Sequence, residues 1–168
     1  MIFKIRKMFR TDGSNDYSLL TPIGDTVCKI ARIKNGFYFY NTHSEQIAQL
    51  TFDKSQACLA IGQHTSHMPS IVVVTAGPNG KLSFQRMGES TDGLTNDIRT
   101  LEICNAGEIT VFGNLNNYSF DIYEGSSLSA NVVPVANDPN YYMLKLDTKA
   151  NALLMVMLVL AIELMTNV

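Results

Sequence analysis

Apolar and polar residues alternate in short segments along most of this chain. Residues 2–9 put three large apolar side chains on one face, as in a half-buried β-strand. That face carries Phe3, Ile5, Lys7 and Phe9. Further segments of this kind follow, separated by residues that favour turns. They give about 12 strand candidates at short, even spacing, which favours a closed β-barrel or a β-sandwich.

Two of these segments repeat each other. Tyr17–Ile30 and Phe37–Leu50 superimpose without a gap at an offset of 20 residues. Each has apolar residues two apart, then a turn former, then apolar residues three apart, which predicts a β-hairpin. A third, looser copy covers 120–133, and the polar run 90–96 is the longest predicted loop.

The last segment differs because it is apolar on every side. Residues 152–162 contain no polar side chain, and we predict a helix over about 150–166. A helix that is apolar all round must be surrounded by protein or by lipid. A bilayer span needs about 20 apolar residues, so we predict that the preceding strands enclose this helix. The alternative is a tail-anchored protein with residues 150–168 in the bilayer.

The composition suits a single globular domain over 1–168, with its strands in about 2–146. Hydrophobic residues make up 46% of the chain and charged residues 17%, which is apolar enough to argue against disorder. The formal net charge is −2, so no overall basic field attracts nucleic acid. We therefore expect no nucleic-acid partner.

The cysteines and the N-terminal segment bear on location. Cys28, Cys58 and Cys104 are odd in number and form no C-x-x-C motif, which predicts neither a disulfide framework nor a zinc ribbon. Charges interrupt the apolar residues near the N-terminus, so the pattern lacks the apolar region of a signal peptide. We expect a cytoplasmic protein without a transmembrane span, either free or peripheral at the membrane.

No motif predicts a catalytic site. The run Gly88–Gly93 is close to a G-x-S-x-G nucleophile elbow, but Asp92 replaces the second glycine and no helix is predicted to follow. His64 and His67 lie three apart near Cys58, but a zinc site needs three or four converging ligands. We therefore predict no catalytic residue, no metal and no cofactor.

Basic residues near the N-terminus give the main lead on binding. Lys4, Arg6, Lys7 and Arg10 fall within seven residues. Lys4 and Arg6 share a strand face, and such a group can hold a phosphate or an anionic lipid headgroup. The alternative is a solvated strand face whose charges discourage edge-to-edge pairing.

Glu163 is the one charged residue inside the apolar helix pattern. A buried charge is costly unless it is paired. We therefore expect Glu163 near the rim of the barrel, where its carboxylate reaches solvent or a basic partner.

The repeated hairpins and the apolar tail together resemble a known family. Tyr17–Ile30 and Phe37–Leu50 follow the pattern Y-x-Φ-Φ-[DNT]-x-x-[GS]-x-x-Φ, where Φ is apolar, and Ala152–Glu163 is similar to a family tail that reads ALL-x-A-LAIAID. The family is the bacterial LURP-one-related branch of the tubby C-terminal-like, phospholipid-scramblase-like fold. The chain departs from the usual pattern at Thr21, where an aspartate is commoner.

The resemblance implies a barrel of about 12 antiparallel strands wrapped around the C-terminal helix. Eukaryotic relatives of this fold include phosphoinositide binders and membrane-associated proteins, which by fold analogy favours lipid. We expect a non-enzymatic binding or scaffold module that binds anionic lipid headgroups, phosphate-bearing ligands or a protein partner. A small-molecule-binding barrel of unknown activity is a further alternative.

Overall fold

The computed structural model describes residues 1–53, 56–61, 70–76, 82–89, 101–104, 109–114, 117–148, 150 and 152–166. These residues form thirteen strands and one helix. The strands are β1 (Ile2–Phe9), β2 (Asn15–Leu20), β3 (Thr26–Ile33), β4 (Gly36–Tyr40), β5 (Gln46–Asp53), β6 (Gln56–Ile61), β7 (Ser70–Ala76), β8 (Leu82–Glu89), β9 (Leu101–Cys104), β10 (Ile109–Asn114), β11 (Ser119–Glu124), β12 (Ser127–Val135) and β13 (Asp138–Leu146). The helix, α1 (Ala152–Thr166), comes last.

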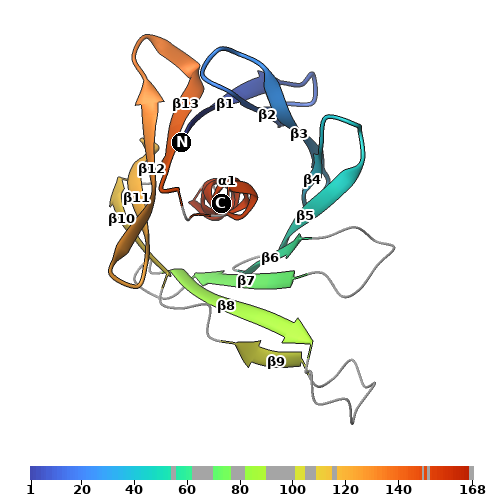
Figure 1. Cartoon of the computed structure of the whole chain (residues 1–168). Coiled ribbons are helices and arrows are strands. Elements are labelled where there is room, and N and C mark those ends of the chain that lie inside the picture. Colours follow the sequence, from blue (N-terminus) through green and yellow to red (C-terminus); the bar gives the residue numbers. More distant parts are fainter. Residues whose placement is uncertain are drawn as a thin grey trace.

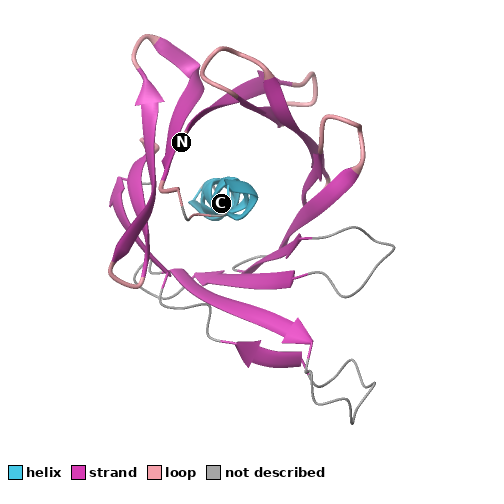
Figure 2. Ribbon diagram, in the orientation of Figure 1, coloured by secondary structure: helices cyan, strands magenta, loops and turns pink. Residues whose placement is uncertain are grey.

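The thirteen strands join one antiparallel sheet that curves around α1 (Figure 1). Their order is β10-β11-β12-β13-β1-β2-β3-β4-β5-β6-β7-β8-β9. The first strand, β1, therefore lies between β2 and the last strand, β13, which brings distant parts of the chain together. Figure 2 shows how strands surround the helix over most of its circumference.

The predicted mainly antiparallel β architecture is confirmed, whereas closure of the barrel is not. The sheet has thirteen strands where the sequence predicted about 12. Its end strands are β9 and β10, and the described residues contain no hydrogen-bonded pair between them. Closure therefore stays a prediction.

The two repeated segments form the predicted hairpins, β2–β3 and β4–β5, with equivalent turns. The backbone N–H of Gly24 donates to the Thr21 carbonyl at 3.0 Å, and that of Ser44 donates to the Asn41 carbonyl at 3.1 Å. Both donors have positive φ, 101° for Gly24 and 62° for Ser44. The Thr21 hydroxyl accepts from the backbone N–H of Asp25 at 3.1 Å. In the second turn, Asn41 Oδ1 accepts from the backbone N–H of Glu45 at 3.0 Å. Each hairpin also has a register shift at the equivalent position before its turn.

Helix α1 lies inside the curved sheet, as the sequence predicted. Every residue of 154–162 is at most 2% exposed. Successive helical residues point about 100° apart, so nine consecutive buried residues mean that protein covers every side of this segment. This burial speaks against the alternative that places 150–168 in a bilayer. Within the described residues, no helix combines the length and apolar character that crossing a membrane requires.

Strand β1 follows its predicted alternation except at its end. Ile5 is fully buried and Phe3 packs against the core. Phe9, predicted on the same half-buried face, is 72% exposed. It occupies the last paired position before the β1–β2 turn, opposite Asn15, and so lies outside the core.

Candidate functional site

The basic residues near the N-terminus have three different environments. Side chains alternate along a strand, so Lys7 shares the inner face of β1 with the buried Ile5, while Lys4 and Arg6 lie on the outer face. Arg10 follows the end of β1. The structure therefore brings Lys4 and Arg6 together and separates Lys7 and Arg10 from them.

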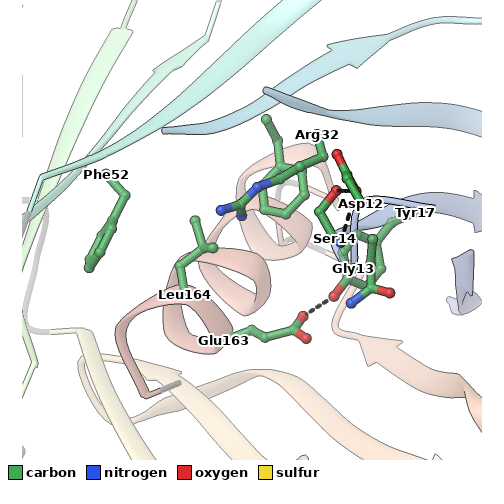
Figure 3. Close-up of a pocket in the computed structure, with 10 residues that line it drawn as sticks. Asp12, Gly13, Ser14, Tyr17, Arg32, Phe52, Glu163 and Leu164 are labelled. Atoms are coloured by element: carbon green, nitrogen blue, oxygen red, sulfur yellow. Dashed lines mark hydrogen bonds between the residues drawn. The ribbon is translucent and has the colours of Figure 1, made fainter. Parts of the chain in front are cut away.

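Lys7 is paired with Glu163 inside the sheet. Its Nζ lies 3.4 Å from Glu163 Oε1, and the two side chains are 17% and 9% exposed. The Tyr17 hydroxyl donates to Glu163 Oε2 at 2.6 Å (Figure 3). The Lys7 ammonium also lies 5.9 Å from the centre of the Tyr118 ring. The expectation that Glu163 reaches a basic partner is confirmed, and Lys7 faces away from the outer surface.

The surroundings of this pair favour neutral phenols. Burial and the neighbouring Glu163 carboxylate raise the pKa of Tyr17. Burial also raises the pKa of Tyr142, although the nearby Lys7 lowers it in part. Tyr17 therefore stays a hydrogen-bond donor to Glu163 across the physiological pH range.

Arg10 is held by acidic neighbours. Its guanidinium lies 3.8 Å from Asp12 and 3.6 Å from Asp16, and it donates to the Arg32 carbonyl at 2.9 Å. The Ser14 hydroxyl and the backbone N–H of Ser14 donate to Asp12 and lower the pKa of that carboxyl. Arg10 thus helps to fix the β1–β2 turn to β3.

Lys4 and Arg6 line a surface cavity of about 320 Å³ where β13, β1 and β2 run side by side. Its lining is completed by Leu20, Pro22, Ile23, Gly24, Val135, Asp138 and Tyr141. Among the described residues neither cation has an ion pair. Arg6 Nη2 donates to Met8 Sδ at 3.5 Å, whereas Arg6 Nε is buried and has no hydrogen-bond partner among the described residues. An arginine that lines the cavity thus keeps an unsatisfied donor beside a second cation.

An exposed apolar turn borders this cavity. Ile23, in the β2–β3 turn, is 86% exposed. Asp138 lies on the other side, where its carboxylate accepts the backbone N–H of Asn140 at 3.2 Å. The site therefore combines two cations with an apolar tip, and sequence reasoning missed that tip. The signal was available, because Ile23 follows Pro22 at the turn of a predicted hairpin.

The structure describes only some of the other residues that the sequence suggested for chemistry. Among the described residues, no group of three or more histidine, cysteine or acidic side chains could hold a metal ion. His64, His67 and the run 88–93, apart from the strand residues Gly88 and Glu89, lie outside the described residues. Burial raises the pKa of Cys28 to about 11 and also raises that of Cys58, so both thiols stay protonated near neutral pH.

Comparison with known proteins gives a likeness of fold. No model of a protein family matches the sequence, and no curated protein matches it. Among solved structures, the chain is similar to the X-ray structure of a protein from Arabidopsis thaliana, with a TM-score of 0.63 and 14% identity. The likeness covers 98% of this chain and 91% of the Arabidopsis chain. At this identity the likeness concerns the fold alone.

Proposed function

We propose that this protein is a non-enzymatic binding module that recognises phosphate groups of anionic lipid headgroups at the outer face of β1. The observation that carries the proposal is the buried, unpartnered Nε of Arg6 in a cavity that Lys4 also lines. Two adjacent cations suit a phosphate, and the arginine offers several donors in a fixed plane. Lys7 and Arg10 play no part, because each already has carboxylate partners.

The exposed Ile23 favours a lipid as the source of the phosphate. A cation holds a headgroup at the membrane surface, while an apolar tip beside it gains free energy by entering the interface. On this basis the protein acts in the cytoplasm and touches the membrane at its periphery. Its buried helix serves as core rather than as anchor.

We also propose that the sheet closes into the barrel of the LURP-one-related, tubby C-terminal-like family. The repeated hairpins, the enclosed apolar helix and the fold likeness over nearly the whole chain support this assignment. The fold by itself assigns no ligand, so the binding proposal stands on the Lys4 and Arg6 cavity.

Vesicle co-sedimentation tests the binding proposal. Vesicles of phosphatidylcholine alone are compared with vesicles that also contain phosphatidic acid. We expect binding to the acidic vesicles only, and a decrease of at least about 30-fold for Lys4→Glu/Arg6→Glu, from roughly 1 kcal/mol per charge. The control Lys29→Glu/Lys34→Glu changes the same charge at exposed sites outside the cavity and should bind nearly as the unmodified protein does.

Two further arms separate lipid from free phosphate. Ile23→Ser should weaken vesicle binding and leave binding of inorganic phosphate unchanged. Phosphate binding without vesicle binding would keep the cavity as a phosphate site and remove the lipid. Equal sedimentation with neutral and acidic vesicles, or with neither and no phosphate binding, would overturn the proposal.

A further inference from the structure

A second cavity, of about 440 Å³, lies at the end of α1 that carries Glu163 (Figure 3). Its lining is Asp12, Gly13, Ser14, Asn15, Tyr17, Arg32, Phe37, Phe52, Glu163 and Leu164. It is separate from the Lys4 and Arg6 cavity, because the two share no lining residue. Its size is that of a pocket for a small organic molecule.

Strand alternation places two polar side chains of this cavity on the inner face of the sheet. Asn15 is two residues before the buried Tyr17 on β2, and Arg32 is two residues after the buried Ile30 on β3. Inner positions of a curved sheet are ordinarily apolar, because a polar group there loses water. Asn15 and Arg32 thus depart from the pattern at the same end of the molecule.

Neither side chain is satisfied by the described residues. Asn15 Oδ1 is buried and accepts no hydrogen bond there. The Arg32 guanidinium lies 5.1 Å from the centre of the Phe37 ring, and no described carboxylate forms an ion pair with it. Stacking on Phe37 fixes the guanidinium plane and leaves its N–H groups available. The cavity therefore offers an unused acceptor and an unused cation.

The other walls define what such a ligand must look like. Phe37, Phe52 and Leu164 supply apolar surface, and in Figure 3 Phe52 and Arg32 approach the cavity from different strands. Glu163 also lines the cavity, but its carboxylate already pairs with Lys7 and accepts from the Tyr17 hydroxyl, so it supplies negative charge that is partly offset by Lys7. An anionic group of a ligand is thus directed to Arg32 and away from Glu163.

We propose that this cavity binds a small carboxylic acid with an aromatic or branched apolar body and one hydroxyl or N–H donor. The carboxylate pairs with the Arg32 guanidinium through two parallel hydrogen bonds. The donor satisfies Asn15 Oδ1, and the body lies against Phe37, Phe52 and Leu164. The site is independent of the proposed lipid binding, because it lies in a different cavity and shares no lining residue with the Lys4 and Arg6 cavity.

Calorimetric titration of the full chain with 4-hydroxyphenylacetate and with indole-3-acetate tests the site. Both probes combine a carboxylate, an aromatic body and a donor. The matched neutral probe is the amide of each acid, which keeps shape and donor and removes the charge. We expect the acids to bind at least about tenfold more tightly than the amides, since a hydrogen bond to a charged group is worth more than a neutral one.

Variants locate the binding within the protein. Arg32→Met should weaken binding of the acids at least about tenfold and abolish the preference over the amides. Asn15→Leu should weaken the acids and the amides alike, because it removes only the acceptor of the donor group. Lys4→Met/Arg6→Met, in the other cavity, should leave binding unchanged. Melting of each variant shows that it is folded.

Backbone NMR shifts of the unmodified protein give a readout that needs no variant. Bound acid should shift the signals of residues 12–15 and Arg32 most strongly. The proposal is overturned if neither acid binds below about 1 mM, if the shifts gather elsewhere, or if a folded Arg32→Met variant keeps its preference for the acids. Failure here with intact vesicle binding would leave the proposed function standing.

Discussion

Replacing Lys7 by methionine tests whether the end of α1 is anchored inside the sheet. The change keeps a long apolar stem and removes the ammonium that lies 3.4 Å from Glu163 Oε1. Glu163 keeps the hydrogen bond from the Tyr17 hydroxyl but loses the ammonium that lies beside its Oε1. A carboxylate that is only 9% exposed cannot replace this partner with bulk water.

The expected loss follows from this burial. Removing one partner of a buried ion pair costs about 3–5 kcal/mol. Lys7 is 17% exposed, so we place the loss at the lower end, about 3 kcal/mol. For 168 residues this lowers the melting temperature by roughly 6–12 °C. Lys7→Met/Glu163→Gln also removes the buried negative charge that the Lys7 ammonium offset and keeps an acceptor for Tyr17, so it should regain about 2 kcal/mol.

Urea unfolding followed by circular dichroism measures these free energies, with Glu163→Gln completing the cycle. The control is Arg10→Met, which removes ion pairs of a 42% exposed side chain and should cost less than about 1 kcal/mol. If Lys7→Met costs no more than this control, the pair behaves as a surface ion pair. If the double variant is no more stable than Lys7→Met, the loss of the Lys7 ammonium beside the Glu163 carboxylate was not the cause. Either result would refute the anchoring.

Three further predictions test the packing and the burial of Cys28. Leu158→Asp puts a charge at a fully buried position and should leave the protein insoluble or unfolded; a soluble product that melts cooperatively would contradict this. Gly36→Ala should cost about 2 kcal/mol or more in urea unfolding, because its Cβ would collide with the Leu50 carbonyl, while Gly24→Ala meets no neighbour and should cost only about 1 kcal/mol through its positive φ. Burial raises the pKa of Cys28 from 9.0 to about 11, so the unfolded thiol loses its proton first and the free energy of unfolding should fall as the pH rises between these values. In the Cys28→Ala variant the free energy of unfolding should fall less steeply over this pH range. If it falls as steeply as in the unmodified protein, the titration of Cys28 is not the cause.

The sequence was sufficient for the elements whose pattern is local. The two hairpins are repeated at an offset of 20 residues in the sequence, and in the structure they have equivalent turns and equivalent register shifts. The unbroken apolar run was sufficient for the buried helix, since protein and lipid are the only surroundings that tolerate it. The closure of the sheet could not be settled in this way, because it depends on which distant strands pair.

The sites were harder to predict because they depend on the face to which each polar residue belongs. Lys7 looked like part of a surface cluster, although its alternation with Ile5 already indicated the inner face. Arg32 likewise lies two residues after the apolar Ile30 in a predicted strand, which would have indicated that Arg32 lies on the inner face. That Lys7 meets Glu163 depends on how α1 lies within the sheet, and no local pattern contains that information.

Oxidation of the native methionines tests the central claim that protein encloses α1. Met155 and Met157 are fully buried, whereas Met1 is 56% exposed and serves as an internal reference. Met155 and Met157 point about 200° apart around the helix, so a helix lying on an outer surface would expose at least one of them. The full chain is treated with hydrogen peroxide in buffer without detergent or lipid, and peptide mass spectrometry measures each oxidation rate.

We expect Met1 to be oxidised rapidly while Met155 and Met157 both remain protected until urea unfolds the chain. In urea all three should react at similar rates. Oxidation of either helix methionine in the folded protein at a rate close to that of Met1 would contradict the enclosure of α1.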